Sequence, residues 1–567
     1  MAGFCPFSQV FYGRILPTTK ALPSCRLYGL SLAPRFPRTP FQRDVLLKPY
    51  SSSAFDSMEK TVSVSFIDQV PVRIGTTQDL ERVTEILQQA SFDEGTICRK
   101  LRLKDMSDTG WLRDDEDISP ELRLLIRLFF QSTLVPRAEV EQVFDRATID
   151  VFLRLGLLGI GEFGDDQYFA PCWLYPVAGC FIASDRYSMP DGSVFRPPPD
   201  IAFPAIYKGS LQFLKLLPAG ITGDVLDLCA GVGIGALMLS QEGSRVVSTD
   251  LSERATQFAR FNCALNGREN IEVVRSDLYE AVKGRTFDCI VAHLPWITEV
   301  NSALHDAYAG GESLSRRLVA GLTESLRPGG VCFALTHGRD TNEGKFEERV
   351  RTWLKDQADQ FDILFACSEV LTSQEILKSI ARRARTSGPE AMAKLESEFE
   401  QAGLLQMAFG GLFIKRHKSR SREPWTVRRT LSAVTQGADV MSALILHDWL
   451  SEPDSLSRIL ASTPQLAPRV KLTSEQVVHE AALVPGEFNF ETDKPFAARD
   501  SFEAWAVRLF ARFDGQTTVA QAFEDSQADA AMPEGVARES FVALVTRALE
   551  AGYLVLPEMP LLSAQSG

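Results

Sequence analysis

The sequence predicts an α/β protein in which a Rossmann-like, mainly parallel sheet is flanked along the chain by helical, winged-helix-like domains. Three observations lead to this fold class. Between residues 224 and 292, short apolar runs alternate with helical patterns, as in a doubly wound parallel sheet. A glycine-rich turn follows the first of these runs, at residues 229–235. The chain has 567 residues, 45% of them hydrophobic, which indicates a globular protein with more than one core.

Residues 1–58 differ in composition from the rest of the chain. They are rich in Pro, Ser and Arg and hold seven basic residues against only Asp44 and Asp56, although the whole chain carries a net charge of −13. We predict a disordered leader here. Its composition is typical of an organellar transit peptide, whereas Met58-Glu59-Lys60 would be a natural start for a cytoplasmic protein with an over-extended amino terminus. The prediction is a cytoplasmic protein, with an organelle as the alternative if the leader is real.

Residues 59–195 are predicted to form a helical, winged-helix-like recognition domain. The expected helices are 77–90, 122–130, 135–143 and 147–158, and strands 167–174 and 180–183 are expected to pair as a β wing. Such a unit binds nucleic acid in some proteins and other proteins in others. Because the chain outside the leader is acidic, we favour recognition of a substrate, or cover of a neighbouring site, over binding to a phosphate backbone.

The first strand, Asp224 to Leu228, is followed by the turn Cys229, Ala230, Gly231, Val232, Gly233 and a helix that begins near Gly235. Glycines without Cβ atoms let the backbone approach a ligand closely. Asp227 leaves a carboxylate at the carboxyl end of the strand, where it suits a cationic amino acid moiety.

Two further strands end in carboxylates at the same edge of the sheet. Arg245 to Thr249 ends at Asp250, whose two oxygens can accept from the hydroxyls of a ribose, with Leu251 directly after it. Ile271 to Ser276 ends at Asp277, which can accept from an adenine amino group while Leu278 packs on the ring. These groups together predict a site for S-adenosylmethionine. The turn also satisfies a dinucleotide fingerprint, so an NAD(P) oxidoreductase is an alternative, but Asp227 would repel a pyrophosphate there.

The fourth strand, Phe287 to Ala292, ends in His293-Leu294-Pro295-Trp296. We predict His293, Pro295 and Trp296 as the catalytic residues. Neutral histidine can accept a hydrogen bond through one ring nitrogen, and Trp296 can stack on a planar acceptor. His293 could instead serve as a general base for a hydroxyl, or only cap the strand. Transfer of a methyl group from S-adenosylmethionine requires mainly that the protein position the acceptor, because the sulfonium is already an activated methyl donor.

The central residues resemble the class I methyltransferases, within them the small-domain branch that includes ribosomal guanine and release-factor glutamine methyltransferases. The resemblance covers about residues 205–417 and is carried by Asp227 to Leu237, Thr249 to Ala255, Phe258 to Asn262, Leu265 to Gly267, Ser276 to Leu278, Tyr308 to Gly311 and Leu326 to Gly330. It implies a seven-stranded sheet and places S-adenosylmethionine at the carboxyl ends of the strands. In that branch the fourth motif is Asn or Asp, two prolines and an aromatic residue, and its first side chain accepts from the target nitrogen. This chain departs from that pattern at His293 and Leu294.

The rest of the methyltransferase domain, predicted over residues 200–417, follows from apolar patterns. Expected are a helix at 314–326, a fifth strand at 331–336 and an antiparallel edge pair, 361–367 and 404–415, with one long helix at 373–401 between them. Residues 418–430 are interpreted as a basic linker, with an RNA or acidic-partner contact as the alternative. Residues 431–567 are expected to form a second helical, winged-helix-like domain.

Neither metal nor membrane is expected. The ten cysteines and six histidines show no ligand spacing, and no apolar run approaches the length needed to span a bilayer. Two functions therefore remain. The first is an S-adenosylmethionine-dependent methyltransferase acting on an N or O acceptor of a peptide or protein, an RNA or a small metabolite. The second is a catalytically silent S-adenosylmethionine-binding regulator that contacts nucleic acid or protein through its winged modules.

Overall fold

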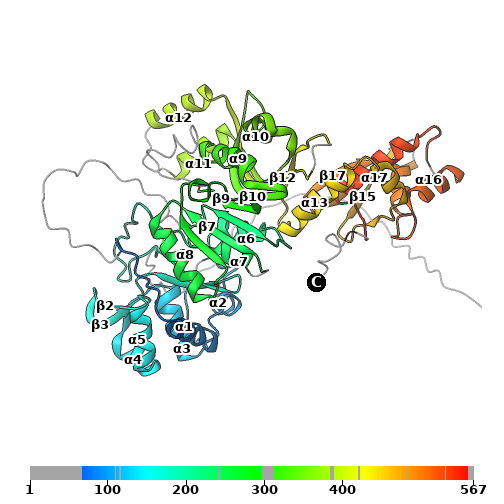
Figure 1. Cartoon of the computed structure of the whole chain (residues 1–567). Helices are drawn as coiled ribbons and strands as arrows, with labels where there is room; N and C mark the ends of the chain where they lie inside the picture. The colour runs from blue at the N-terminus through cyan, green and yellow to red at the C-terminus, as the bar shows by residue number, and fades with distance from the viewer. Residues whose placement is uncertain are drawn as a thin grey trace, which may run out of the picture. The chain divides into compact units, whose positions relative to one another are not determined.

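The computed structural model describes residues 67–559, apart from 109, 114–115, 241–242, 296–311, 384–388, 419–421, 480–481, 530–531 and 558. Figure 1 shows the chain with its helices and strands labelled. The predicted leader, Trp296 and the motif Tyr308 to Gly311 lie outside the described residues.

A mixed sheet of eight strands forms the centre of the described chain (Figure 1). Its strands are β6 (Asp224–Leu228), β7 (Arg245–Asp250), β8 (Ile271–Arg275), β9 (Phe287–His293), β10 (Leu326–Thr341), β11 (Phe361–Thr372), β12 (Leu404–Arg416) and β13 (Thr426–Thr430). The order across the sheet is β13-β11-β12-β10-β9-β6-β7-β8. Strands β6 to β10 run parallel to one another, and β12 is antiparallel to both β10 and β11. The predicted Rossmann-like sheet, including its antiparallel edge pair, is confirmed.

The sheet has one strand more than the seven predicted. Residues 426–430, expected within a linker, form β13, which pairs in parallel with β11. Arg428 gives the physical reason. Its guanidinium donates to Asp340 at 2.6 Å and to Glu347 at 3.0 Å, so acids far away in sequence neutralise it within the sheet. The linker prediction is therefore wrong over residues 426–430, because the partners of Arg428 are distant in the sequence.

Helices cover both faces of the sheet. They are α6 (Lys208–Lys215), α7 (Ile234–Leu239), α8 (Glu253–Leu265), α9 (Ser313–Ser325), α10 (Phe346–Trp353), α11 (Ser373–Arg383) and α12 (Pro389–Gln401). One buried cluster joins α9 and α10 to the sheet through Leu318 and Phe346, and another joins α6 and α7 to it through Phe213 and Ala236. The long helix predicted over 373–401 is two helices, α11 and α12, on either side of residues that the structure does not describe.

The amino-terminal part contains more strands than expected. Its elements are α1 (Thr77–Gln89), α2 (Glu94–Leu101), α3 (Pro120–Leu125), the π-helical segment Ile126–Phe130, β1 (Val135–Pro136), α4 (Arg137–Val143), α5 (Arg146–Arg154), β2 (Gly159–Gly161), β3 (Gly164–Phe169), β4 (Trp173–Val177) and β5 (Cys180–Ser184). The predicted pairing of 167–174 with 180–183 is confirmed only at its end, where Leu174 pairs with Ala183, and is wrong for residues 167–169. β3 pairs with β1 and β2, whereas β4 pairs with β5 as a separate hairpin. Two tight turns, with positive φ at Gly161 and Gly164 and at Ala178 and Gly179, make two hairpins in place of one.

The carboxyl-terminal part begins with α13 (Gly437–Leu450), which packs on the sheet through Val440 and Leu444. It continues with α14 (Ser455–Ala461), β14 (Gln465–Leu466), β15 (Lys471–His479), β16 (Ala482–Thr492), β17 (Ala498–Phe502), α15 (Ala504–Phe510), α16 (Val519–Ala528), α17 (Arg538–Ala551) and β18 (Leu554–Val555). Strands β15, β16 and β17 form one sheet, and β14 pairs with β18. Edge-to-face ring contacts among Phe490, Phe502 and Phe510 centre its own core.

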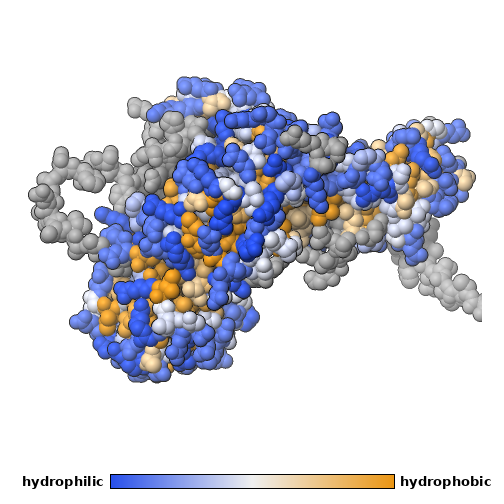
Figure 2. Space-filling model, viewed as in Figure 1, coloured by the Kyte–Doolittle hydropathy of each residue, from blue (hydrophilic) through white to orange (hydrophobic). Residues whose placement is uncertain are grey.

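Hydrophilic residues dominate the face of the molecule seen in Figure 2. None of the helices in the described ranges is long and apolar enough to cross a membrane.

Candidate cofactor and active site

The turn after β6 brings the backbone to the carboxyl edge of the sheet. Cys229, Gly231 and Gly233 have φ values of 55°, 55° and 84°, in the left-handed region that favours glycine. The N–H of Ala230 donates to the carbonyl of Thr249 at 3.0 Å, which ties the turn to β7. A Cβ at Gly231 would meet no atom within 4 Å, so the turn faces open space there. The predicted close approach of a ligand to this backbone therefore has room.

Asp227 is buried beneath this turn, with 1% of its surface exposed. Neither carboxylate oxygen accepts a well-aligned hydrogen bond within the described part of the chain. Burial raises the pKa of Asp227 to about 8, and the nearby Ala236 N–H lowers it by less than burial raises it. A Cβ at Gly235 would lie 2.7 Å from Asp227 Oδ2, so glycine makes the room for this carboxylate. A buried, unsatisfied acid is costly unless a cation or donor from outside completes it.

Asp250 ends β7 beside the same turn. One of its oxygens accepts from the N–H of Gly231 and the other from the N–H of Ser252, both at 2.9 Å. Each oxygen still has a lone pair for a further donor. Burial raises the pKa of Asp250, and the backbone donors oppose that shift. Leu251 beside it is 63% exposed, an unusual position for a leucine unless a ligand covers it.

Asp277 and Leu278 follow β8 as predicted, but their surroundings differ from the expectation. Asp277 forms an ion pair with Arg317 of α9, with 2.8 Å between Nη2 and Oδ1. Leu278 has a φ of 50° and only 5% of its surface exposed, so Leu251 offers more apolar surface than Leu278 does. No local pattern pointed to Arg317, because it lies on a helix that follows another strand.

His293 is the last residue of β9. Its ring stacks on Phe213 of α6, with 5.3 Å between centroids and 19° between planes. Nε2 lies 3.5 Å from the Cβ position of Gly209, so α6 passes close to the ring. Burial lowers the pKa of His293 to about 4. The imidazole is therefore neutral near pH 7, which suits a hydrogen-bond acceptor. The same low pKa makes the ring a weak base, which argues against the general-base alternative.

Pro295 is exposed after this strand. Trp296, the third predicted catalytic residue, lies outside the described residues.

The amino-terminal domain is fastened to α8, next to Asp250. Arg254 forms a fully buried ion pair with Asp185, with both side chains below 7% exposed and 2.6 Å between Nε and Oδ2. The Asn262 amide both donates to and accepts from Ala183 of β5. Tyr207, which caps α6, makes an edge-to-face contact with Tyr187 at 5.5 Å. Sequence reasoning missed Asp185 and Tyr187 because their partners are distant in the chain.

In the described ranges, no group of three or more His, Cys, Asp or Glu could hold a metal ion. The cysteines described there are free.

The central segment of the chain matches a known protein family. Residues 204–363 match the family described as "Methyltransferase small domain". Together with the strand order, this match identifies the class I methyltransferase fold in the central domain.

Several curated proteins are similar to the same segment. A release factor glutamine methyltransferase of Xylella fastidiosa is 33% identical over 143 residues, which are 23% of this chain and 52% of that protein. A ribosomal RNA small subunit methyltransferase C of Alcanivorax borkumensis is 25% identical over 24% of this chain and 42% of its own length. A ribosomal protein L11 methyltransferase of Caldanaerobacter subterraneus is 40% identical over 15% of this chain and 28% of its own. The chain thus spans about half the length, or less, of these relatives.

Among solved structures, a SAM-dependent methyltransferase from Agrobacterium tumefaciens is 16% identical and covers 48% of this chain and 80% of its own, with a TM-score of 0.25.

Proposed function

We propose that this chain is an S-adenosylmethionine-dependent methyltransferase whose catalytic domain lies within residues 200–417. The observation that carries the proposal is Asp227, a buried carboxylate with no well-aligned hydrogen bond in the described chain, beside an open glycine turn. The methionine part of the cofactor has an ammonium group that would complete it. The family match over residues 204–363 supports the same cofactor.

The other residues of the site would each contact a different part of the cofactor. Asp250 would accept from the ribose hydroxyls with its free lone pairs, and exposed Leu251 would cover one face of the adenine. Asp277, held by Arg317, would accept from the adenine amino group. The backbone of Cys229, Ala230, Gly231 and Gly233 would line the methionine end. Bound in this way, S-adenosylmethionine supplies an activated methyl group.

His293 would then position the acceptor. A neutral imidazole can accept from an N–H and align the lone pair of that nitrogen with the methyl group. With a pKa near 4 it is a poor acceptor for the proton of a hydroxyl. We therefore propose a nitrogen acceptor rather than an oxygen, with Pro295 and Trp296 completing the wall against a planar group.

The acceptor is proposed to belong to a macromolecule. The similar proteins are named for a release factor, a ribosomal RNA and a ribosomal protein, and two of these three substrates are proteins. We favour a protein nitrogen, selected by the winged-helix-like domain at 59–195, and the cytoplasm as the compartment. RNA and small metabolites are the alternative acceptors.

The test uses the full chain, labelled methyl donor and cell extract separated into protein, RNA and small-molecule fractions. Label is expected in the protein fraction. Asp250→Ala should lose cofactor binding and labelling together, whereas His293→Ala should keep cofactor binding and lose labelling. If the chain binds S-adenosylhomocysteine but labels no fraction, it is the silent cofactor-binding regulator. If it binds neither donor nor product, the cofactor assignment is refuted.

A further inference from the structure

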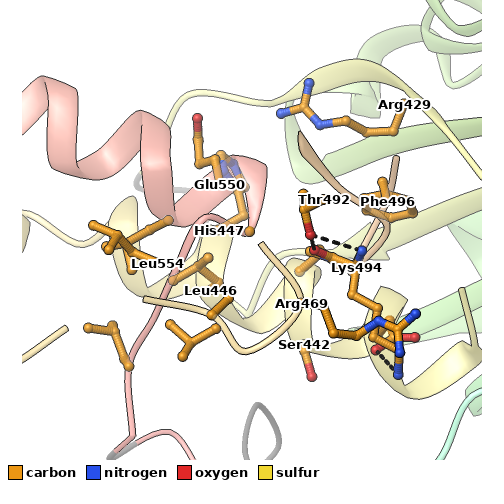
Figure 3. A pocket seen from close by; sticks show the side chains of 18 of the residues that line it. Arg429, Ser442, Leu446, His447, Arg469, Thr492, Lys494, Phe496, Glu550 and Leu554 are labelled. Atoms are coloured by element: carbon orange, nitrogen blue, oxygen red, sulfur yellow. Dashed lines mark hydrogen bonds and ion pairs between the residues drawn. The ribbon is translucent and has the colours of Figure 1, made fainter. Parts of the chain in front are cut away.

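A cavity lies away from the proposed cofactor site. Its volume is about 290 Å³, and it is lined by residues of β13, α13, the segments 465–469 and 492–496, and the segment 549–557 (Figure 3). Arg429 lines it from β13, which is five strands from β6 in the sheet. At a strand spacing of about 4.8 Å, that is about 24 Å across the sheet. Pockets for small molecules start at about this volume.

Much of the wall is apolar. Leu446 of α13, Phe496 and Leu554 of β18 line the cavity, and Figure 3 shows their side chains around it. Trp425 and His447, which also line the cavity, stack on each other at 4.1 Å between centroids. Burial lowers the pKa of His447 to about 4, so this stack carries no charge near pH 7.

Some of the charged residues at the cavity already have partners. Lys494 pairs with Asp439 at 3.3 Å, and Arg469 pairs with Asp493. Within each pair the two charges neutralise each other, so neither pair needs a partner from a ligand.

Arg429 and Glu550 are different. Neither has a hydrogen bond or an ion pair within the described part of the chain, although both line the cavity. Asp500, the other acid that acts on Arg429, already accepts from Tyr553 Oη at 2.9 Å and from Arg547. Figure 3 shows Arg429 and Glu550 extending from different elements toward the same end of the cavity. One end therefore offers a cation and an anion that attract each other but form no direct hydrogen bond or ion pair in the described chain.

The surroundings make both charges costly. Burial lowers the pKa of the Arg429 guanidinium and raises the pKa of the Glu550 carboxyl, and each opposes the other's shift by attraction. Half-buried charges without hydrogen bonds are disfavoured unless a ligand supplies the missing partners. A ligand that carries a carboxylate and an ammonium group a few ångströms apart would satisfy both.

We infer that this cavity binds a free α-amino acid with an apolar side chain. Its carboxylate pairs with the planar fork of Arg429, a geometry that favours two parallel hydrogen bonds. Its ammonium group donates to Glu550, and its side chain lies against Leu446, Phe496 and Leu554. A peptide end fits less well, because it presents only one of the two charges beside a given side chain. This site is independent of the proposed methyl transfer.

The test is calorimetry on the full chain with L-leucine, L-methionine and L-phenylalanine as probes. At least one of the three amino acids is expected to bind. The N-acetyl and amide derivatives of that amino acid each lack one of its two charges, and each should bind at least tenfold more weakly than the free amino acid. For leucine, these derivatives are N-acetyl-leucine and leucinamide. Binding should persist in Asp250→Ala, which removes part of the proposed cofactor site. That result would also separate this site from the cofactor site, whatever the fate of the proposed activity.

Charge-removing variants complete the test. Arg429→Gln and Glu550→Gln should each weaken amino acid binding at least tenfold. The matched controls Arg538→Gln and Glu539→Gln, both exposed on α17, should leave it within about twofold. Should a variant fail to fold, the derivatives measured on the unaltered chain decide the question. No heat with any of the three amino acids, or equal affinity for the charged and blocked forms, overturns the inference.

Discussion

The state of Asp227 gives the sharpest test of the cofactor site. With a pKa of about 8, this carboxyl is about 90% protonated in the free protein at pH 7. An ammonium group bound beside it favours the charged form, so binding should expel that proton. The expected release is about 0.9 proton per ligand at pH 7, falling to about 0.1 at pH 9.

Linkage fixes the sign of the effect on affinity. Because the proton stabilises the free state, raising the pH favours the complex. Affinity for S-adenosylhomocysteine should therefore increase about 50-fold between pH 6 and pH 8. For the free protein the folded pKa lies above the unfolded value of 3.8, so the stability contribution of Asp227 is lost as the pH rises from 3.8 through about 8.

The assay is calorimetric titration with S-adenosylhomocysteine at each pH, in pairs of buffers with different ionisation enthalpies. Asp227→Asn keeps the shape and cannot ionise, so it serves as the matched control and should release about 0.9 proton fewer at pH 7. If the unaltered protein and Asp227→Asn released the same number of protons on binding at each pH, the reasoning would be refuted. Absence of binding in the unaltered chain would refute the cofactor assignment itself.

Three further outcomes follow from the same site. Asp250→Asn should weaken cofactor binding by about tenfold or more, measured by titration, because a hydrogen bond to a charged group is worth about 1.5–3 kcal/mol; an unchanged affinity would remove Asp250 from the site. Gly235→Ala should weaken binding as well, since the new Cβ would lie 2.7 Å from Asp227 Oδ2, and equal affinity in the alanine variant would contradict that crowding. The methylation rate should show no titration of His293 between about pH 5.5 and 8, because its pKa lies near 4; an inflection there that His293→Gln abolishes would restore the general base.

The sequence by itself determined the central fold and predicted the edge of the sheet at which we propose that the cofactor binds. Parallel strands present their carboxyl ends at one edge, so Asp227, Asp250 and Asp277 could be assigned to one site from local patterns alone. The same logic placed His293 at the end of the fourth strand. Each of these inferences needs only the residues of one strand and the turn that follows it.

Only the tertiary structure decided the features that depend on partners far along the chain. Burial raises the pKa of Asp227 under the turn, and burial lowers the pKa of His293, whose ring stacks on Phe213. The strand β13 pairs with β11, and its Arg428 donates to Asp340, a residue 88 positions away. Likewise, Arg429 and Glu550 line one cavity although more than a hundred residues separate them. Periodicity reports which face of an element is apolar, whereas burial, charge pairing and cavities depend on which faces meet.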